Sequence, residues 1–243
     1  MRRFRLLFPL LAFAALCSPA FGPRGTSARQ LNAPKAAAAA ALEQEVLQEI
    51  NLARTRPAEY AAYLEQLRTR FDGREYRRPG RPGLMTAEGA AALEEAIGFL
   101  RAAKPLPPLS LSDGMCSGAR ELVRDQAGTD ATGHKAADGS FCEQRAKRFG
   151  TWMEPIGENL SYSDDTARER VITLLVDDGF ASRGHRKRIF DASFRVAGVA
   201  CGDHKLGAMC VITLAGGFSD AAKAARPATH PAAQPLPAGA KRF

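Results

Sequence analysis

The sequence predicts an α+β domain, in which helices come before most of the strands. Apolar residues recur at helical spacing through several segments of the first half of the chain. β-branched residues gather instead near the end of the domain, in residues 209–216. Helices followed by antiparallel strands are typical of a sheet covered by separate helices.

Both ends of the chain differ in composition from the part between them. Residues 1–20 have arginines, then a short apolar run, then small residues, which is the pattern of a secretory signal peptide cleaved after Ala20. We expect residues 21–40 to form a flexible linker and residues 220–243, rich in proline and alanine, to form a disordered tail. The domain then occupies residues 41–219, without an internal repeat.

The first segment of the domain is predicted to be a helix that ends at Pro57. Val46 and Ile50 lie one helical turn apart on its apolar stripe. A second short helix is expected through Leu64. The stretch 68–85 is polar and contains glycine and proline, so a loop is predicted there.

Three further helices are predicted. Thr86 caps a helix over residues 86–103, and Ser112 caps another over residues 112–128. A third covers residues 166–179. Strands are expected late and short, at residues 159–163, 196–201 and 209–216.

The cysteines indicate disulfides. Once Cys17 leaves with the leader, four remain in an oxidising compartment. Cys201 and Cys210 lie on two predicted strands around a glycine-bearing loop, so we pair them, and a Cys116–Cys142 bridge follows by elimination. The chain has no CxxC spacing, which argues against a cysteine zinc site.

Charge and hydropathy argue against two classes of partner, nucleic acids and the membrane interior. The formal net charge is +8 and falls by three when the leader arginines are removed. Basic residues are scattered with few aromatics among them, so no nucleic-acid partner is expected. No other apolar stretch is long enough to span a bilayer, so we expect no integral membrane segment after signal removal. The predicted location is secreted or periplasmic, and the oligomeric state stays open.

Four histidines are candidates for a site. His230 lies in the tail, and His204 lies in a predicted hairpin loop, where solvent exposure is expected. His134 and His185 each follow a glycine just after a predicted helix end. A glycine there allows a sharp turn that aims the imidazole back across the helix end.

Three stretches carry a family resemblance: "GHKAADGS", "IGENLSY" and "VDDGFASRGHRKRIFDASFRVAGVACG". In this order they resemble the bacterial SCP-like branch of the CAP superfamily, which includes cysteine-rich secretory proteins, antigen 5 and pathogenesis-related proteins. The resemblance covers roughly residues 43–218. It implies an α-β-α sandwich, with a small antiparallel sheet between helices, and a cleft where two histidines and one or two acids converge. By position it implies His134, Glu158 and His185 for that cleft.

The chain departs from the family pattern at one position. Eukaryotic members carry a second glutamate in a Trp-Tyr-x-Glu motif, which this chain lacks. Asp178 lies on the apolar stripe of its predicted helix and is therefore expected to point into the cleft. Ser182 lies near the missing glutamate and is too short to replace it. We therefore expect no required cofactor, and at most weak zinc binding by His134 and His185.

The leading functional expectation is a binding module without catalytic activity, whose cleft takes a lipid-like or cell-envelope ligand. This follows from the resemblance. The alternative is a hydrolase of wall or protein substrates, with His134 or His185 as base, Glu158 as its orienting partner or zinc as Lewis acid. Ser117 and Ser182 are its candidate nucleophiles. A third possibility is a partner-binding domain with a vestigial cleft.

Overall fold

The computed structural model describes residues 28–221. The expected signal peptide 1–20, residues 21–27 of the expected linker and residues 222–243 of the expected tail, including His230, lie outside these residues. Contacts divide the chain into two units, with the boundary between Ala36 and Ala37. Of the first unit only the beginning of the first helix is described, and all packing described below lies within the second unit.

Helix α1 (Ala28–Thr55) begins inside the segment expected to be a linker. Residues 28–40 are therefore helical, because alanine has the highest helix propensity and a run of alanines continues the helix backwards. Val46, Ile50 and Ala53 are fully buried, as the predicted stripe requires. Helix α2 (Pro57–Glu65) starts with Pro57 in its first turn, where a missing N–H costs nothing.

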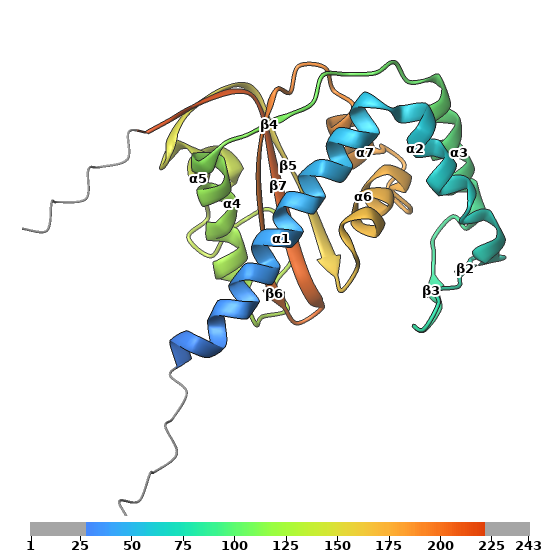
Figure 1. The fold of residues 1–243 in the computed structure, drawn as a ribbon, viewed down its shortest axis with the longest axis horizontal. Coiled ribbons are helices and arrows are strands. Elements are labelled where there is room, and N and C mark those ends of the chain that lie inside the picture. Colours follow the sequence, from blue (N-terminus) through green and yellow to red (C-terminus); the bar gives the residue numbers. More distant parts are fainter. Residues whose placement is uncertain (1–27, 222–243) are drawn as a thin grey trace, which may run out of the picture. The chain divides into compact units, whose positions relative to one another are not determined.

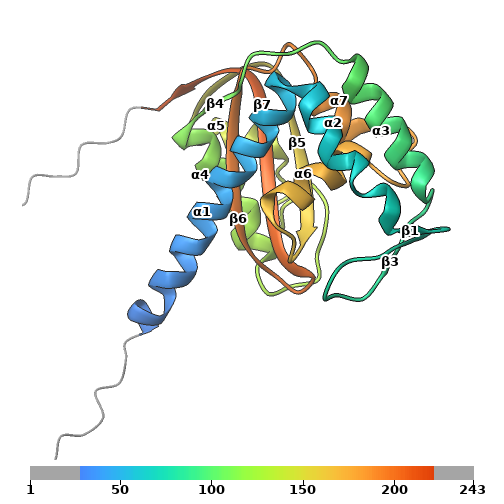
Figure 2. The ribbon, with the colours of Figure 1, turned by 45° about the vertical axis from the view of Figure 1, so that its right-hand side comes forward.

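The predicted loop 68–85 contains a short 3₁₀ turn (Arg68–Arg70) and a small antiparallel meander. Its strands are β1 (Phe71–Asp72), β2 (Glu75–Tyr76) and β3 (Leu84–Met85). In Figures 1 and 2 the meander lies below helices α2 and α3, away from the main sheet.

Helix α3 (Ala90–Ala102) begins four residues after Thr86, so the predicted Thr86 cap is wrong, and Gly89 is the residue at the N-cap. Helix α4 (Asp113–Gln126) has the predicted Ser112 cap, whose hydroxyl accepts the Met115 N–H. Helices α5 (Cys142–Lys147), α6 (Ala167–Val176) and α7 (Gly184–Ile189) complete the set. Among the described helices, none is long and apolar enough to cross a membrane.

The main sheet has the order β4-β6-β7-β5. Its strands are β4 (Ser110–Leu111), β5 (Gly150–Ser163), β6 (Val196–His204) and β7 (Gly207–Asp220). β6 and β7 form a hairpin, β5 pairs antiparallel with β7, and β4 alone is parallel to its neighbour. The long strand β5 therefore lies at one edge of the sheet.

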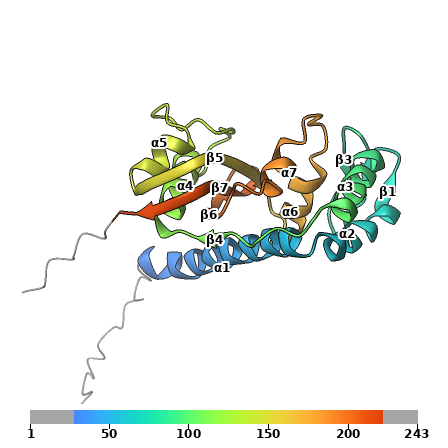
Figure 3. The ribbon, with the colours of Figure 1, turned by 90° about the horizontal axis from the view of Figure 1, so that it is seen from above.

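Two hydrophobic clusters cover the two faces of the sheet. The larger contains α1, α2, α3 and α6 against Val199, Ile212 and Leu214. The smaller contains α4 against Ala200 and Val211, with Leu160 and Tyr162 of β5 packed on it. Figure 3 shows α4 and α5 on one side of the sheet and α1 on the other. This is the expected α+β sandwich of helices around a small sheet.

Close packing holds α4 against the sheet. A Cβ added at Gly198 would lie 2.3 Å from the Met115 carbonyl carbon, so only glycine fits between β6 and α4. This close contact fixes the position of α4 on the sheet, and with it the start of the segment that follows α4. That segment includes His134.

Candidate functional site

Strand β5 directs neighbouring side chains to opposite faces of the sheet. Glu158 faces the α4–α5 layer, and Asn159 faces the α6–α7 layer, because side chains alternate along a strand. Glu158 pairs with Thr213 of β7 and is 3% exposed. A charged carboxylate at this depth needs partners of its own.

Glu158 has two strong partners. Its Oε1 lies 3.0 Å from Nδ1 of His134, and its Oε2 accepts a 2.6 Å bond from Nη2 of Arg145. The hydroxyl of Thr213 lies 3.5 Å from the same Oε2. The carboxylate therefore holds an imidazole with one oxygen and a guanidinium with the other.

Arg145 fixes the loop that carries His134. Its side chain is 1% exposed, and its Nη1 donates to the carbonyl oxygens of His134 and Ser140. One buried residue of α5 thus joins the strand, the imidazole loop and its own helix end. The backbone and the ring of His134 are both positioned by this network, and its side chain stays 42% exposed.

The second histidine has a separate carboxylate. Nδ1 of His185 lies 2.6 Å from Oδ1 of Asp177, and the backbone N–H of His185 donates to Oδ2 at 2.9 Å. Asp177 is 3% exposed. Burial raises the pKa of this carboxyl, but the bonds from His185 outweigh burial and leave the pKa below its usual value.

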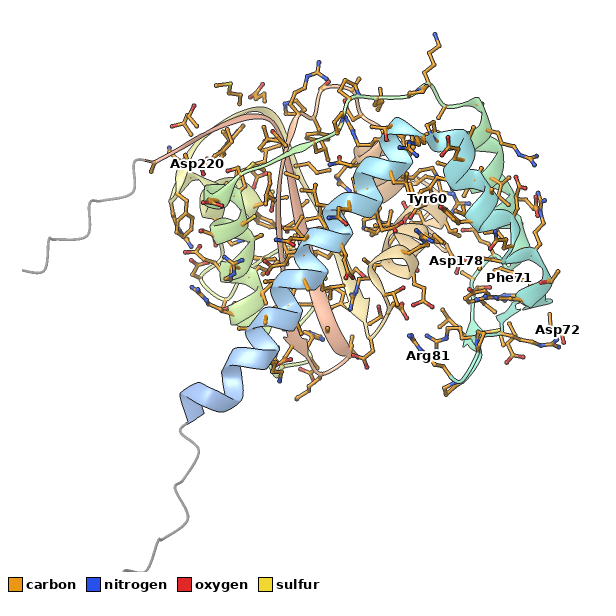
Figure 4. All side chains as sticks on the ribbon, viewed as in Figure 1. Tyr60, Phe71, Asp72, Arg81, Asp178 and Asp220 are labelled. Carbon is orange, nitrogen blue, oxygen red and sulfur yellow. A yellow bond between two sulfur atoms is a disulfide. The ribbon has the colours of Figure 1, made fainter. Side chains whose placement is uncertain are left out.

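The expectation that Asp178 points into the cleft is wrong. Helix α6 ends at Val176, and Asp177 follows in the left-handed conformation with φ 54°. Helical spacing stops at that turn, so Asp177 faces His185 and Asp178 faces away. The Asp178 carboxylate accepts the backbone N–H groups of Ala87 and Glu88 and lies on the side of α3 and the meander (Figure 4).

The two histidines are held at neighbouring residues of the edge strand. Glu158 holds the ring of His134, while the side-chain amide of the next residue, Asn159, donates to the backbone oxygen of His185. His134 therefore approaches β5 from the α4–α5 layer and His185 from the α6–α7 layer. In each ring Nδ1 donates to a buried carboxylate, which leaves Nε2 of the neutral ring as a hydrogen-bond acceptor or metal-ligand atom.

A three-ligand zinc site does not fit the residues present. Within residues 28–221, no group of three or more histidine, cysteine, aspartate or glutamate side chains is arranged to hold a metal. Both oxygens of Glu158 already bind protein groups, so this residue positions His134 and is not a free ligand. The ligand atoms left at the site are the two Nε2 atoms.

Of the two expected disulfides, the structure contains one. Cys201 and Cys210 face each other across the β6–β7 hairpin and are bonded. The expected Cys116–Cys142 bridge is wrong, since both are buried free thiols. Cys116 of α4 faces the sheet and accepts the Val199 N–H, so it is not available to α5.

The expectation that His204 is exposed to solvent is also wrong. It is buried, with Nε2 bound to the Ala131 oxygen at 2.8 Å and its ring against Tyr162. It belongs to the packing of the smaller layer. Of the candidate nucleophiles, Ser117 donates to the Asp113 carbonyl of its own helix, and Ser182 is exposed in the loop before α7.

Sequence patterns missed Arg145 and Asp177. The available signal for Asp177 was the glycine and arginine run after α6, which ends a helix early. No sequence signal pointed to Arg145, because an arginine in a short helix is ordinarily exposed to solvent. Its role depends on its contact with Glu158 of strand β5.

Comparisons with known proteins identify a family and show similarity to solved structures. The family model described as "CAP: Cysteine-rich secretory protein family" matches residues 75–213. An extracellular protein containing an SCP domain from Bacillus anthracis str. Ames has a similar solved structure, with 19% identity and a TM-score of 0.37. That match covers 45% of this chain, and the chain spans 34% of the length of that structure. No match was found among the curated proteins.

Proposed function

Because this chain belongs to the cysteine-rich secretory protein family, we propose that it is an extracytoplasmic binding module without catalytic activity. Its site at strand β5 takes a lipid-like or cell-envelope ligand. The observation that carries the proposal is the pair of imidazoles, each tied through Nδ1 to a buried carboxylate. Side chains fixed in this way bind a ligand without losing further rotamer freedom.

The chemistry at the site suits a ligand with a polar head and an apolar part. Because Nδ1 of each ring donates to a carboxylate, Nε2 of a neutral ring accepts from a ligand hydroxyl or amide group, and Nε2 donates to a phosphate or carboxylate oxygen when the ring is protonated. Phe180 lies edge-on to the His185 ring, with centroids 5.5 Å apart, and is 59% exposed. A large exposed aromatic beside a polar anchor supports contact with an acyl chain or a similar apolar group.

The hydrolase alternative has less support. A histidine with an orienting carboxylate is the right pair for a base, and His134 with Glu158 qualifies. Ser117, however, is bound to the backbone of α4, and the contacts of the described residues join neither Ser117 nor Ser182 to an imidazole. Binding through fixed donors needs no nucleophile, so it accounts for the geometry more directly.

The test uses the exported full-length protein and three separate probes: a long-chain fatty acid, a phosphatidylglycerol and a soluble wall-glycan fragment. Binding is followed by native mass spectrometry, which reports the mass of the bound and recovered probe. We expect one probe to bind, and His134→Ala and His185→Ala to weaken it by about tenfold each, as expected for loss of one hydrogen bond to a charged group.

Lys104→Ala is the matched control, because Lys104 is exposed and follows α3 rather than the site. Unchanged binding in both histidine variants would refute the proposed site. Recovery of a cleaved probe would refute the non-catalytic proposal and support the hydrolase.

Zinc is a separate question with its own measurement. With two imidazole ligands and water, we propose weak binding that depends on both histidines. Protons compete with zinc for the imidazole nitrogens, so zinc binding should weaken in acid. Calorimetric titration of wild type, His134→Ala and His185→Ala tests this, and equal affinity in all three would place any zinc elsewhere.

A further inference from the structure

One arginine of helix α7 lies at the histidine site without a counter-charge. Arg183 and Arg186, which stand before and after His185 in the sequence, both form ion pairs with Glu95 of α3. Arg188 is half-buried, and it forms no ion pair with any residue that the structure describes. A guanidinium that is partly removed from water keeps its charge, so it favours an anionic partner.

The Arg188 side chain lies against strand β5 at the residues that hold the two histidines. A Cβ added at Gly157 would lie 3.3 Å from Cδ and Nε of Arg188, so the side chain rests on the strand one residue before Glu158. Nη1 of Arg188 lies 3.5 Å from Oδ1 of Asn159, whose amide donates to the His185 carbonyl oxygen. A single side chain therefore separates the guanidinium from the backbone of His185.

The protein leaves most of the donors of this guanidinium unused. Within residues 28–221 it makes one hydrogen bond, to Asn159, and at 3.5 Å that bond is at the outer limit of hydrogen-bond geometry. In Arg186, by contrast, Nε, Nη1 and Nη2 all donate to protein oxygens. A guanidinium has five N–H donors, so Arg188 has several to offer to a ligand.

We infer that Arg188 binds the anionic group of the ligand, a carboxylate or a phosphate, beside His185. This inference rests on the proposed function, because it adds a residue to the same site. A neutral imidazole offers Nε2 only as an acceptor, so the histidines recognise a negative charge only when they are protonated. The guanidinium stays protonated in proteins, and its fork of donors matches carboxylate and phosphate oxygens. Arg188 therefore gives the site a preference for anions that does not depend on the imidazoles.

The first test compares two probes that differ only in the head group, a long-chain fatty acid and the fatty alcohol of the same chain length. Binding to the exported full-length protein is measured by equilibrium dialysis at about pH 8.5, where a carboxylic acid is ionised. We expect the acid to bind about 10- to 100-fold more tightly than the alcohol, the range for one hydrogen bond to a charged group. Arg188→Gln should remove this preference by weakening the acid alone, and Arg188→Lys, which keeps the charge, should retain part of it.

Arg70→Gln is the matched control. Arg70 is also half-buried and forms no ion pair with a described residue, but it ends the short turn before the meander, away from the main sheet. Its substitution makes the same charge change, and the acid and the alcohol should bind as they bind wild type. Because alcohol binding is measured in every variant, a variant that fails to fold loses both probes and is recognised.

A second measurement tests Arg188 without any lipid. Inorganic phosphate is added to isotope-labelled protein at constant ionic strength, and the arginine Nε–H signals are followed by NMR. The Arg188 signal is assigned by its absence from Arg188→Lys, and the Arg70 signal by its absence from Arg70→Gln. We expect phosphate to shift the Arg188 signal saturably and to leave the Arg70 signal in place.

Two results would overturn the inference. An acid-to-alcohol affinity ratio in Arg188→Gln equal to that of wild type would show that another group recognises the charge. A phosphate titration that leaves the Arg188 signal unmoved would show that its guanidinium does not receive anions. Failure of both lipid probes to bind, together with a saturable phosphate shift, would refute the lipid-like ligand of the proposed function and would still support Arg188 as the anion-binding residue.

Discussion

Glu158→Gln should destabilise the protein by about 3 to 5 kcal/mol, the cost of removing one partner from a buried ion pair. The side chains of Glu158 and Arg145 are each 1% exposed and are joined at 2.6 Å. Glutamine keeps the shape of the side chain but leaves the Arg145 guanidinium buried without a counter-charge. The cost comes from that unpaired charge rather than from lost packing.

The structure offers a matched control in Arg68 and Glu94. Their N–O distance is also 2.6 Å, but the two side chains are 41% and 48% exposed. An exposed pair contributes about 0 to 1 kcal/mol, so Glu94→Gln should cost no more than that. Two pairs of equal length should therefore differ several-fold in their effect, because burial and not distance decides the outcome.

Urea unfolding followed by far-UV circular dichroism measures both variants against wild type. The double variant Glu158→Gln with Arg145→Met removes both charges, so its cost should be smaller than the sum of the two single variants. It should still be less stable than wild type, since the carbonyls of His134 and Ser140 lose their donor. Equal stability of Glu158→Gln and Glu94→Gln would refute the reasoning.

Three further predictions follow from the cysteines and from one surface carboxylate. Breaking the Cys201–Cys210 bridge, which spans nine residues of sequence, should lower the urea-unfolding free energy by about 2 to 3 kcal/mol; an unchanged midpoint in the double serine variant would contradict this. Burial of Cys116 raises the pKa of its thiol, and burial of Cys142 raises its pKa to about 12, so a disulfide reagent at neutral pH should label both only after urea is added; rapid labelling of the folded protein would show that they are accessible. The hydrogen bond from the Arg183 guanidinium lowers the pKa of Glu88 to about 2, below the pKa of about 4.3 expected for a glutamate in the unfolded chain. Its stabilising effect should be complete above the unfolded value and lost as pH falls towards 2, so Glu88→Gln should unfold with a weaker acid dependence than wild type.

Periodicity predicted the long helices because their buried stripes depend on local spacing. Val46 and Ile50 of α1 and Leu122 of α4 are fully buried, as their spacing requires. Helices α5 and α7 have six residues each, too few for a stripe to be recognised.

Strand β5 was predicted to be five residues long and has fourteen. Its first half contains Pro155 and several polar residues, which argue against a strand considered alone. Proline and charge are tolerated there because β5 is an edge strand with one side unpaired. The length of β5 is set by its pairing with β7, about sixty residues later in the chain. The local sequence of β5 does not indicate which strand it pairs with.

The histidine site shows the same division between local and distant information. His134, Glu158 and His185 came from a family resemblance, whereas the groups that hold them depend on how the chain ends its helices. Helix α6 could have continued through Asp178 by pattern alone. The left-handed turn at Asp177 moves the inward position by one residue, and the carboxylate of Asp178, which was expected in the cleft, instead accepts backbone N–H groups of the segment before α3.

That single turn also explains why the site lacks a third metal ligand. With Asp177 tied to Nδ1 and to the backbone N–H of His185, and Glu158 tied to Arg145, each carboxylate is consumed in orienting a ring. A carboxylate held by these bonds is fixed in orientation by the groups that it positions, so it is not free to turn towards a cation. The arrangement therefore favours two rigid imidazoles whose Nε2 atoms hydrogen-bond a ligand, and this is the property that the histidine variants test.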